Sequence, residues 1–175
     1  MGKMAVNKAS RHDVRAPSRK LLKLLKDKDS QLYKDNVARF GIPEELVWKT
    51  FSEEELLESV DSGKSTFYLA LENGLKVLGF AHSVVQQDEQ IVELNRIVVF
   101  PECARKGIGT RLLNKVVGDQ EKRGISRIVV NAGKEKMLVR MFYRKNGFKV
   151  VEEKMLEGSS DKIPLVVYEL QMKPE

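Results

Sequence analysis

The chain has 175 residues, of which 42% are hydrophobic and 32% are charged, and this composition suits one globular domain with a sizeable core. It contains a single cysteine, which excludes an intramolecular disulfide framework, and no apolar run approaches the length of a membrane span, so we expect a cytoplasmic protein. The formal net charge is +6, but the basic residues are not interleaved with aromatic ones; we interpret them as solvated helix faces and expect no nucleic-acid partner.

The first part of the chain is predicted to be mostly helical. A short edge strand is expected over residues 3–9, and apolar residues then recur at helical spacing. Four helical segments are expected to begin near Pro17, Leu32, Pro43 and Ser52. The second has Phe40 as its last apolar residue and is expected to end at Gly41, and the fourth is expected to end at Gly63. This part, residues 10–62, is expected to form the acceptor side of the molecule.

After Gly63 the apolar pattern changes to that of strands. Three strands are expected at 66–71, 77–86 and 91–100, with a hairpin turn at Glu72-Asn-Gly74 between the first two. A helix is then predicted from Gly107, followed by a strand at 125–130 whose continuous apolar run indicates burial on both faces. A helix at 137–145 and two antiparallel strands at 148–155 and 165–172, joined around a loop at 158–161, complete the chain. The order predicts a single α/β domain over residues 1–175, with a mixed sheet and a core over residues 64–172.

The stretch from Glu93 to Thr110 is the most informative. An apolar strand ends at Pro101, a short basic loop follows, and Gly107 and Gly109 open an amphipathic helix. The first turn of a helix has unpaired N–H groups and partial positive charge, and glycines leave room for an anion beside them. Position 112 is Leu, so the dinucleotide-binding fingerprint fails, and no P-loop sequence occurs. We therefore predict a diphosphate site of another kind.

Two motifs resemble the GNAT N-acetyltransferase superfamily. Val99-Phe-Pro101 followed by Ala104-Arg-Lys-Gly107-Ile-Gly109 is similar to its motif A, except that Ala104 replaces the usual Arg or Gln and the guanidinium comes one place later, at Arg105. Met141-Phe-Tyr-Arg-Lys-Asn-Gly-Phe148 resembles the family's second element. The resemblance implies a mixed, mostly antiparallel central sheet flanked by helices. It also implies transfer of the acetyl group of acetyl-CoA to an amine by direct attack, with no covalent enzyme intermediate and no metal.

The resemblance also implies which residues hold the coenzyme. The main chain from the loop into the helix would bind the pyrophosphate, and these residues are Arg105, Lys106, Gly107, Ile108, Gly109 and Thr110. The pantetheine arm would lie along Ile97, Val98 and Val99, whose backbone would also polarise the thioester carbonyl; the alternative is that these three are only core residues of a strand. Lys136 stands where the family often has Asn, so we suggest Asn131 as a substitute.

Two side chains are candidates for the chemistry. Glu93 is the candidate general base, and the alternatives are an ordinary strand carboxylate paired with Arg96 or a base made of water. Tyr143 is the candidate donor to the departing thiolate, and its alternative is a core aromatic. His82 could face the acceptor, although a lone strand histidine is more often structural.

The acceptor is expected to be a primary amine. Residues 44–61 carry seven acidic side chains against Lys49 alone, which favours a cationic acceptor such as a polyamine, a lysine or a protein amino terminus; a merely solvated acidic face is the alternative. The acidic residues are Glu44, Glu45, Glu53, Glu54, Glu55, Glu58 and Asp61. The competing functions are a non-catalytic acyl-CoA sensor of the same fold and, on net charge alone, an RNA-associated protein. The C-terminal strands leave room for a homodimer.

Overall fold

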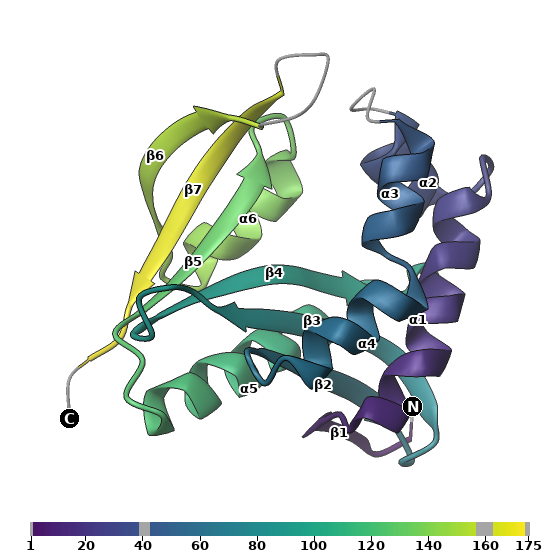
Figure 1. The fold of residues 1–175 in the computed structure, drawn as a ribbon, viewed down its shortest axis with the longest axis horizontal. Coiled ribbons are helices and arrows are strands. Elements are labelled where there is room, and N and C mark those ends of the chain that lie inside the picture. The colour runs from purple at the N-terminus through teal and green to yellow at the C-terminus, as the bar shows by residue number, and fades with distance from the viewer. Residues whose placement is uncertain (1, 39–42, 157–162, 174–175) are drawn as a thin grey trace.

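A computed structural model describes residues 2–38, 43–156 and 163–173, and these residues form a seven-stranded sheet with the order β1-β2-β3-β4-β5-β7-β6 (Figure 1). The strands are β1 (Met4–Lys8), β2 (Ser65–Glu72), β3 (Lys76–Val85), β4 (Ile91–Val99), β5 (Arg127–Gly133), β6 (Lys149–Met155) and β7 (Pro164–Gln171). Neighbouring strands are antiparallel except β4 and β5, which are parallel. This confirms the predicted α/β class with a mixed, mostly antiparallel sheet.

Helices cover the two faces of the sheet and form two apolar cores. They are α1 (Arg11–Lys26), α2 (Gln31–Asn36), α3 (Glu44–Thr50), α4 (Glu53–Asp61), α5 (Ile108–Lys122) and α6 (Met137–Lys145), with a short 3-10 turn η2 (Pro101–Cys103). One core joins α5 and α6 to the sheet, and the other joins α1, α3 and α4 to its opposite face. In Figure 1 the N-terminal helices lie near β2, β3 and β4, while β5, β7 and β6 stand apart from them. No described helix is both long and apolar enough to cross a membrane.

The first helix begins earlier than predicted. It starts at Arg11 instead of near Pro17, because the N–H and hydroxyl of Ser10 both donate to Asp13 Oδ2, at 2.8 and 2.6 Å, and fix the first turn. Pro17 lies inside the helix on its buried side. Phe40 and Gly41, where the second helix was expected to end, and the loop at 158–161 lie outside the described residues.

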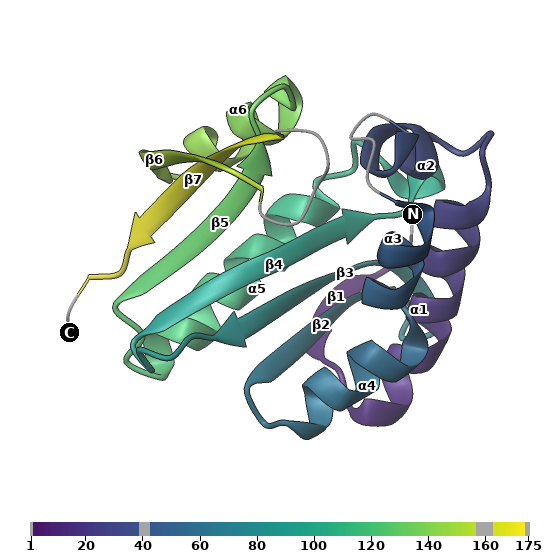
Figure 2. The same cartoon turned by 45° about the horizontal axis from the view of Figure 1, so that its top comes forward.

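The strands β4 and β5 separate soon after they begin to pair. Their parallel pairing covers only Ile91–Glu93 against Arg127–Val129. Beyond Glu93 the two strands diverge, which Figure 2 shows as a widening gap between β4 and β5. The β5 side of β4 is therefore without a strand partner from Leu94 onward.

The strand β5 is buried on one face only, so the prediction of burial on both faces was wrong. Ile128, Val130 and Ala132 are buried in the α5–α6 core, whereas Val129 and Asn131 are only half-buried. The reason is that the N-terminal helices pack on β2, β3 and β4 and leave the corresponding face of β5 open.

A β-bulge interrupts β4 at Asn95. His82 of β3 pairs with Arg96 and Ser83 pairs with Leu94, so Asn95 is an extra residue without a partner on β3. Leu94 before the bulge and Ile97 after it both pack toward α5, while Val98 packs toward the N-terminal helices. Because side chains alternate along a strand, the extra residue brings Glu93 and Arg96 to the same face, opposite α5.

Candidate active site

A cavity of about 740 Å³ lies where β4 and β5 separate. β4 contributes residues 94–99 to its lining and β5 contributes residues 130–133. The remaining walls come from α6, including Tyr143, and from α1 and α2. Lys136 Nζ donates to Asn36 Oδ1 at 2.9 Å and thereby links α6 to α2 beside the cavity. The cavity thus joins the predicted coenzyme strand to the predicted acceptor helices.

The predicted anion site is the N-terminus of α5. Gly107 caps the helix at φ +72°, and Arg105 also has a positive φ of +60°. The first intrahelical hydrogen bond is donated by Arg111 N–H to Gly107 O at 3.1 Å, so the amides of the preceding turn have no partner within the helix. The side chains of Arg105, Lys106 and Thr110 are exposed, whereas that of Ile108 is buried in the core. Ile108 can therefore contact a ligand only through its main chain.

The two glycines of this turn differ in what surrounds them. A Cβ at Gly107 would meet no atom within 4 Å, which leaves space beside the helix end. A Cβ at Gly109 would lie 3.6 Å from the ring of Phe142 and 3.8 Å from Val99. Gly109 therefore adjoins the end of β4 and the helix α6, and this contact places the start of α5 next to the cavity residue Val99.

Ile97, Val98 and Val99 all line the cavity. Their side chains pack alternately into the two cores, as the alternative interpretation required. Their main-chain groups on the β5 side have no strand partner, since the β4–β5 pairing ends at Glu93. An extended ligand arm could take the place of a strand there.

Glu93 lies at the closed end of the gap and does not itself line the cavity. Its carboxylate accepts hydrogen bonds from Gln86 Nε2 and from Asn131 Nδ2, each at 3.1 Å, so its partner is not Arg96. Asn131 does line the cavity, and its Oδ1 atom is buried without a hydrogen-bond partner among the described residues. Asn131 thus stands between the candidate base and the cavity.

Tyr143 lines the cavity and is only 6% exposed. Its ring packs edge-on against Phe142 and Phe148, with centroids 5.3 Å away in each case, and lies 6.0 Å from that of Tyr168. Burial raises the pKa of the Tyr143 phenol well above its ordinary value near 10. The hydroxyl is therefore a neutral donor throughout the physiological pH range.

Arg96 is a site residue that the sequence reasoning considered only as a partner of Glu93. It lines the main cavity and also a smaller one of about 300 Å³, which is bounded by α3, α4 and β3 and includes His82. His82 is 2% exposed, stacks on Phe67 with centroids 4.1 Å apart, and has its Nε2 3.0 Å from Ser65 Oγ. Burial, helped by the charge of Arg96, lowers the pKa of His82 to about 3. An arginine inside a mostly apolar strand was the sequence signal that could have identified Arg96 as a site residue.

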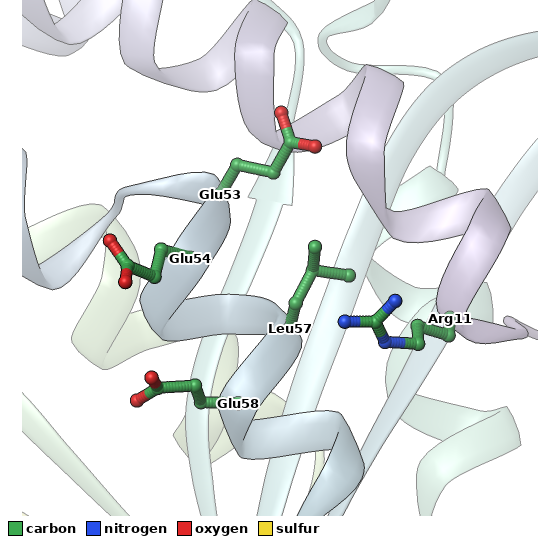
Figure 3. Close-up of a pocket in the computed structure, with 5 residues that line it drawn as sticks. All are labelled: Arg11, Glu53, Glu54, Leu57 and Glu58. Atoms are coloured by element: carbon green, nitrogen blue, oxygen red, sulfur yellow. The ribbon is translucent and has the colours of Figure 1, made fainter.

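Two members of the acidic run of the N-terminal helices are paired with arginines of α1. Glu53 forms ion pairs with Arg15 and Arg19, and Asp61 with Arg11. A shallow pocket between α1 and α4, with Arg11 reaching toward Leu57, contains part of the run (Figure 3). That pocket shares no residue with the main cavity, and Glu55 is the member of the run that lines the smaller cavity.

Residues 63–150 match the family model of the acetyltransferase (GNAT) domain. No curated protein sequence matches the chain.

Several solved structures share the fold. The PaiA N-acetyltransferase of Thermoplasma acidophilum, solved in complex with coenzyme A, is 23% identical, with a TM-score of 0.72 over 97% of this chain and 99% of that one. YncA of Salmonella typhimurium, solved with its cofactor acetyl-CoA, is 16% identical, with a TM-score of 0.70 over 99% and 96%. An N-acetyltransferase of Staphylococcus aureus Mu50 is 20% identical, with a TM-score of 0.70 over 98% and 100%. At these identities the likeness is one of fold.

Proposed function

The chain belongs to the GNAT acetyltransferase family, and on that premise we propose that it transfers the acetyl group of acetyl-CoA directly to a primary amine. The observation that carries this proposal is the cavity between β4 and β5, which extends from Val99, beside the free amides of α5, to Tyr143. Two structures of the same fold were solved with coenzyme A or acetyl-CoA, which supports the choice of coenzyme.

In this proposal the coenzyme lies along β4. The pyrophosphate binds the amides from Arg105 to Thr110, with the exposed side chains of Arg105 and Lys106 adding positive charge. The pantetheine arm pairs with the main chain of 97–99 on the side that faces β5, where no strand lies beside it. Asn131 Oδ1 accepts a hydrogen bond from the arm or from the attacking amine.

The thiolate leaves beside Tyr143. A phenol is already a weaker acid than a thiol, and burial raises the pKa of Tyr143 further. Tyr143 therefore stabilises the departing thiolate by donating a hydrogen bond while keeping its proton. A main-chain N–H of β4 polarises the thioester carbonyl in the same way.

The attacking amine must first lose a proton. We propose Glu93 as the base, and since Asn131 separates it from the cavity, the proton reaches its carboxylate through a relay water. Attack on the carbonyl then forms the C–N bond and breaks the C–S bond, and the second proton that the nitrogen loses passes to the departing thiolate. The products are the amide and coenzyme A, with no covalent enzyme intermediate.

The acceptor is proposed to be a primary amine with cationic character. Glu55 at the smaller cavity supports this, and so does Asp35 at the main one. A lysine, a polyamine and a protein amino terminus fit this description. We also propose a cytoplasmic location, in keeping with the buried free thiol of Cys103.

Two measurements test the proposed function. Saturating acetyl-CoA at 100 times its Kd should stabilise the protein by about 2.7 kcal/mol, seen as a rise in Tm, and coenzyme A should act similarly. Release of free thiol from acetyl-CoA should then depend on an added amine. Stabilisation without thiol release for any amine would favour a sensor, and stabilisation by RNA alone would favour an RNA-associated protein.

A further inference from the structure

Arg96 carries a charge that the described protein does not neutralise. Its guanidinium lies 4.3 Å from the ring centroid of Phe51, and its Nη1 atom is buried with no hydrogen-bond partner among the described residues. Burial lowers the pKa of Arg96 to about 10, and no carboxylate in the described ranges offsets this effect. The group is therefore still protonated near neutral pH, in surroundings where an unpaired charge is costly and a bound anion is stabilised.

The position of Arg96 connects it to the acceptor. Asn95 and Arg96 line both the main cavity and the smaller one, so they form the boundary between them. The bulge at Asn95 brings Arg96 to the same face of β4 as Glu93, three residues away. An acceptor that reaches the thioester from the side of α3 and α4 therefore passes the guanidinium.

The other groups at the smaller cavity do not provide Arg96 with an anionic partner. His82, which pairs with Arg96 across the β3–β4 ladder, is a neutral imidazole at physiological pH. Lys49 adds a second cation, and Glu55 lines the cavity but forms no ion pair with Arg96 in the described structure. A guanidinium with free donors is suited to a planar, two-oxygen anion.

We propose that Arg96 binds a carboxylate of the acceptor, so that the substrate is a primary amine that also carries a carboxylate. This inference rests on the proposed function and narrows its acceptors. Free lysine has both groups, whereas a polyamine has amines but no carboxylate. A protein amino terminus has a carboxylate near its amine only when an acidic side chain follows. The shared chemistry is an amine and a carboxylate a few bonds apart.

Pairs of amines that differ only in the carboxylate provide the test. Lysine and cadaverine form one pair, and ornithine and putrescine form a second. We expect the wild-type protein to have a kcat/KM at least 10-fold higher for the amino acid in each pair. Arg96→Gln should lower kcat/KM for the amino acid by about 10- to 100-fold and change that for the diamine less than 3-fold. Peptides beginning Ala-Asp and Ala-Asn distinguish a side-chain carboxylate from that of a free amino acid.

Control variants separate binding from folding. Arg96→Lys keeps a charge without the planar fork and should give an intermediate preference. Arg11→Gln removes an arginine outside both cavities and should leave the preference unchanged. The KM for acetyl-CoA and the Tm show whether each variant is folded. If Arg96→Gln fails to fold, the proposal is still tested by the wild-type ratios of kcat/KM for amino acid and diamine and by the Arg96→Lys variant.

Three results would overturn the inference. Equal use of lysine and cadaverine by the wild-type protein would do so, and so would an equal loss for both substrates in Arg96→Gln. In both of these cases, acetylation of the diamines would still support the proposed function. Coenzyme binding without acetylation of any amine would defeat both proposals.

Discussion

The side-chain amide of Asn131, on β5, donates a 3.1 Å hydrogen bond to Glu93 Oε1, on β4, at the point where the two strands part. Gln86 donates to the other carboxylate oxygen at the same distance. The two bonds fix the orientation of the carboxylate, and Asn131 presents its own Oδ1 next to it. Glu93 is therefore held in place at the closed end of the cavity.

Replacing Glu93 by Gln tests the proposed base. The variant keeps the size of the side chain but cannot accept a proton, so we expect kcat to fall about 100-fold. Glu89→Gln, on the exposed turn before β4, is the matched control and should be unaffected. An unchanged kcat in Glu93→Gln would assign the proton transfer to water or another group.

Tyr143→Phe removes one hydroxyl from the cavity and leaves the aromatic cluster intact. We expect kcat to fall by about 100-fold while the KM for acetyl-CoA changes little, because the hydroxyl acts on the leaving thiolate. The Tm should stay close to that of the wild type, since the ring contacts remain. Tyr33→Phe, on α2, is the control. Equal turnover in Tyr143→Phe would end the assignment.

Two glycines of α5 should respond oppositely to alanine. Gly107 has φ +72°, where a side chain is strained, so Gly107→Ala should cost about 1–2 kcal/mol in the free energy of unfolding and raise the KM for acetyl-CoA. Gly118 lies inside α5, and a Cβ added there would meet no atom within 4 Å, so Gly118→Ala should stabilise the protein by about 0.5–1 kcal/mol without changing that KM. Urea unfolding and steady-state kinetics measure both effects. A Gly107→Ala variant with normal stability and KM would contradict this.

His82 should make stability depend on pH. Its pKa is about 3 in the folded protein and near 6.5 when unfolded, so below pH 6.5 the unfolded state binds more protons and stability falls as the pH falls toward 3. Between pH 8 and pH 5 the loss from this residue should be about 2 kcal/mol. Urea unfolding of His82→Gln should show a smaller loss over that range. His12 is the other histidine and is exposed, so the His12→Gln variant should lose as much stability over that range as the wild type.

Local signals predicted many elements. The hairpin at Glu72-Asn-Gly74 is confirmed, with Asn73 at φ +52° and Gly74 at φ +74°, the backbone that Asn-Gly favours. The helix α6 covers Met137–Lys145 as predicted, because Gly147, at φ +89°, ends the apolar repeat. The motif around Gly107 predicted the start of α5, because a glycine there allows the positive φ of the residue that caps the helix. These features depend on a few neighbouring residues.

Features that depend on distant contacts were not predictable. Nothing local marks the parting of β4 from β5, which depends on how α5 and α6 pack on one face while the other stays open. The bulge at Asn95 is a one-residue slip against β3 and contains no glycine that would mark it in the sequence. The setting of Arg96 depends on Phe51, at the end of α3. The Asn131–Glu93 hydrogen bond likewise joins residues that only the fold brings together.

The extra residue in β4 has a consequence for insertions and deletions. A chain lacking Asn95 would gain an uninterrupted ladder between β3 and β4. Leu94 and Arg96 would then be adjacent along the strand, so Glu93 and Arg96 would lie two residues apart and would still share a face. The bulge thus lengthens β4 without changing which face its charged side chains occupy, and a chain shortened by this one residue would remove the irregularity while keeping Glu93 and Arg96 together.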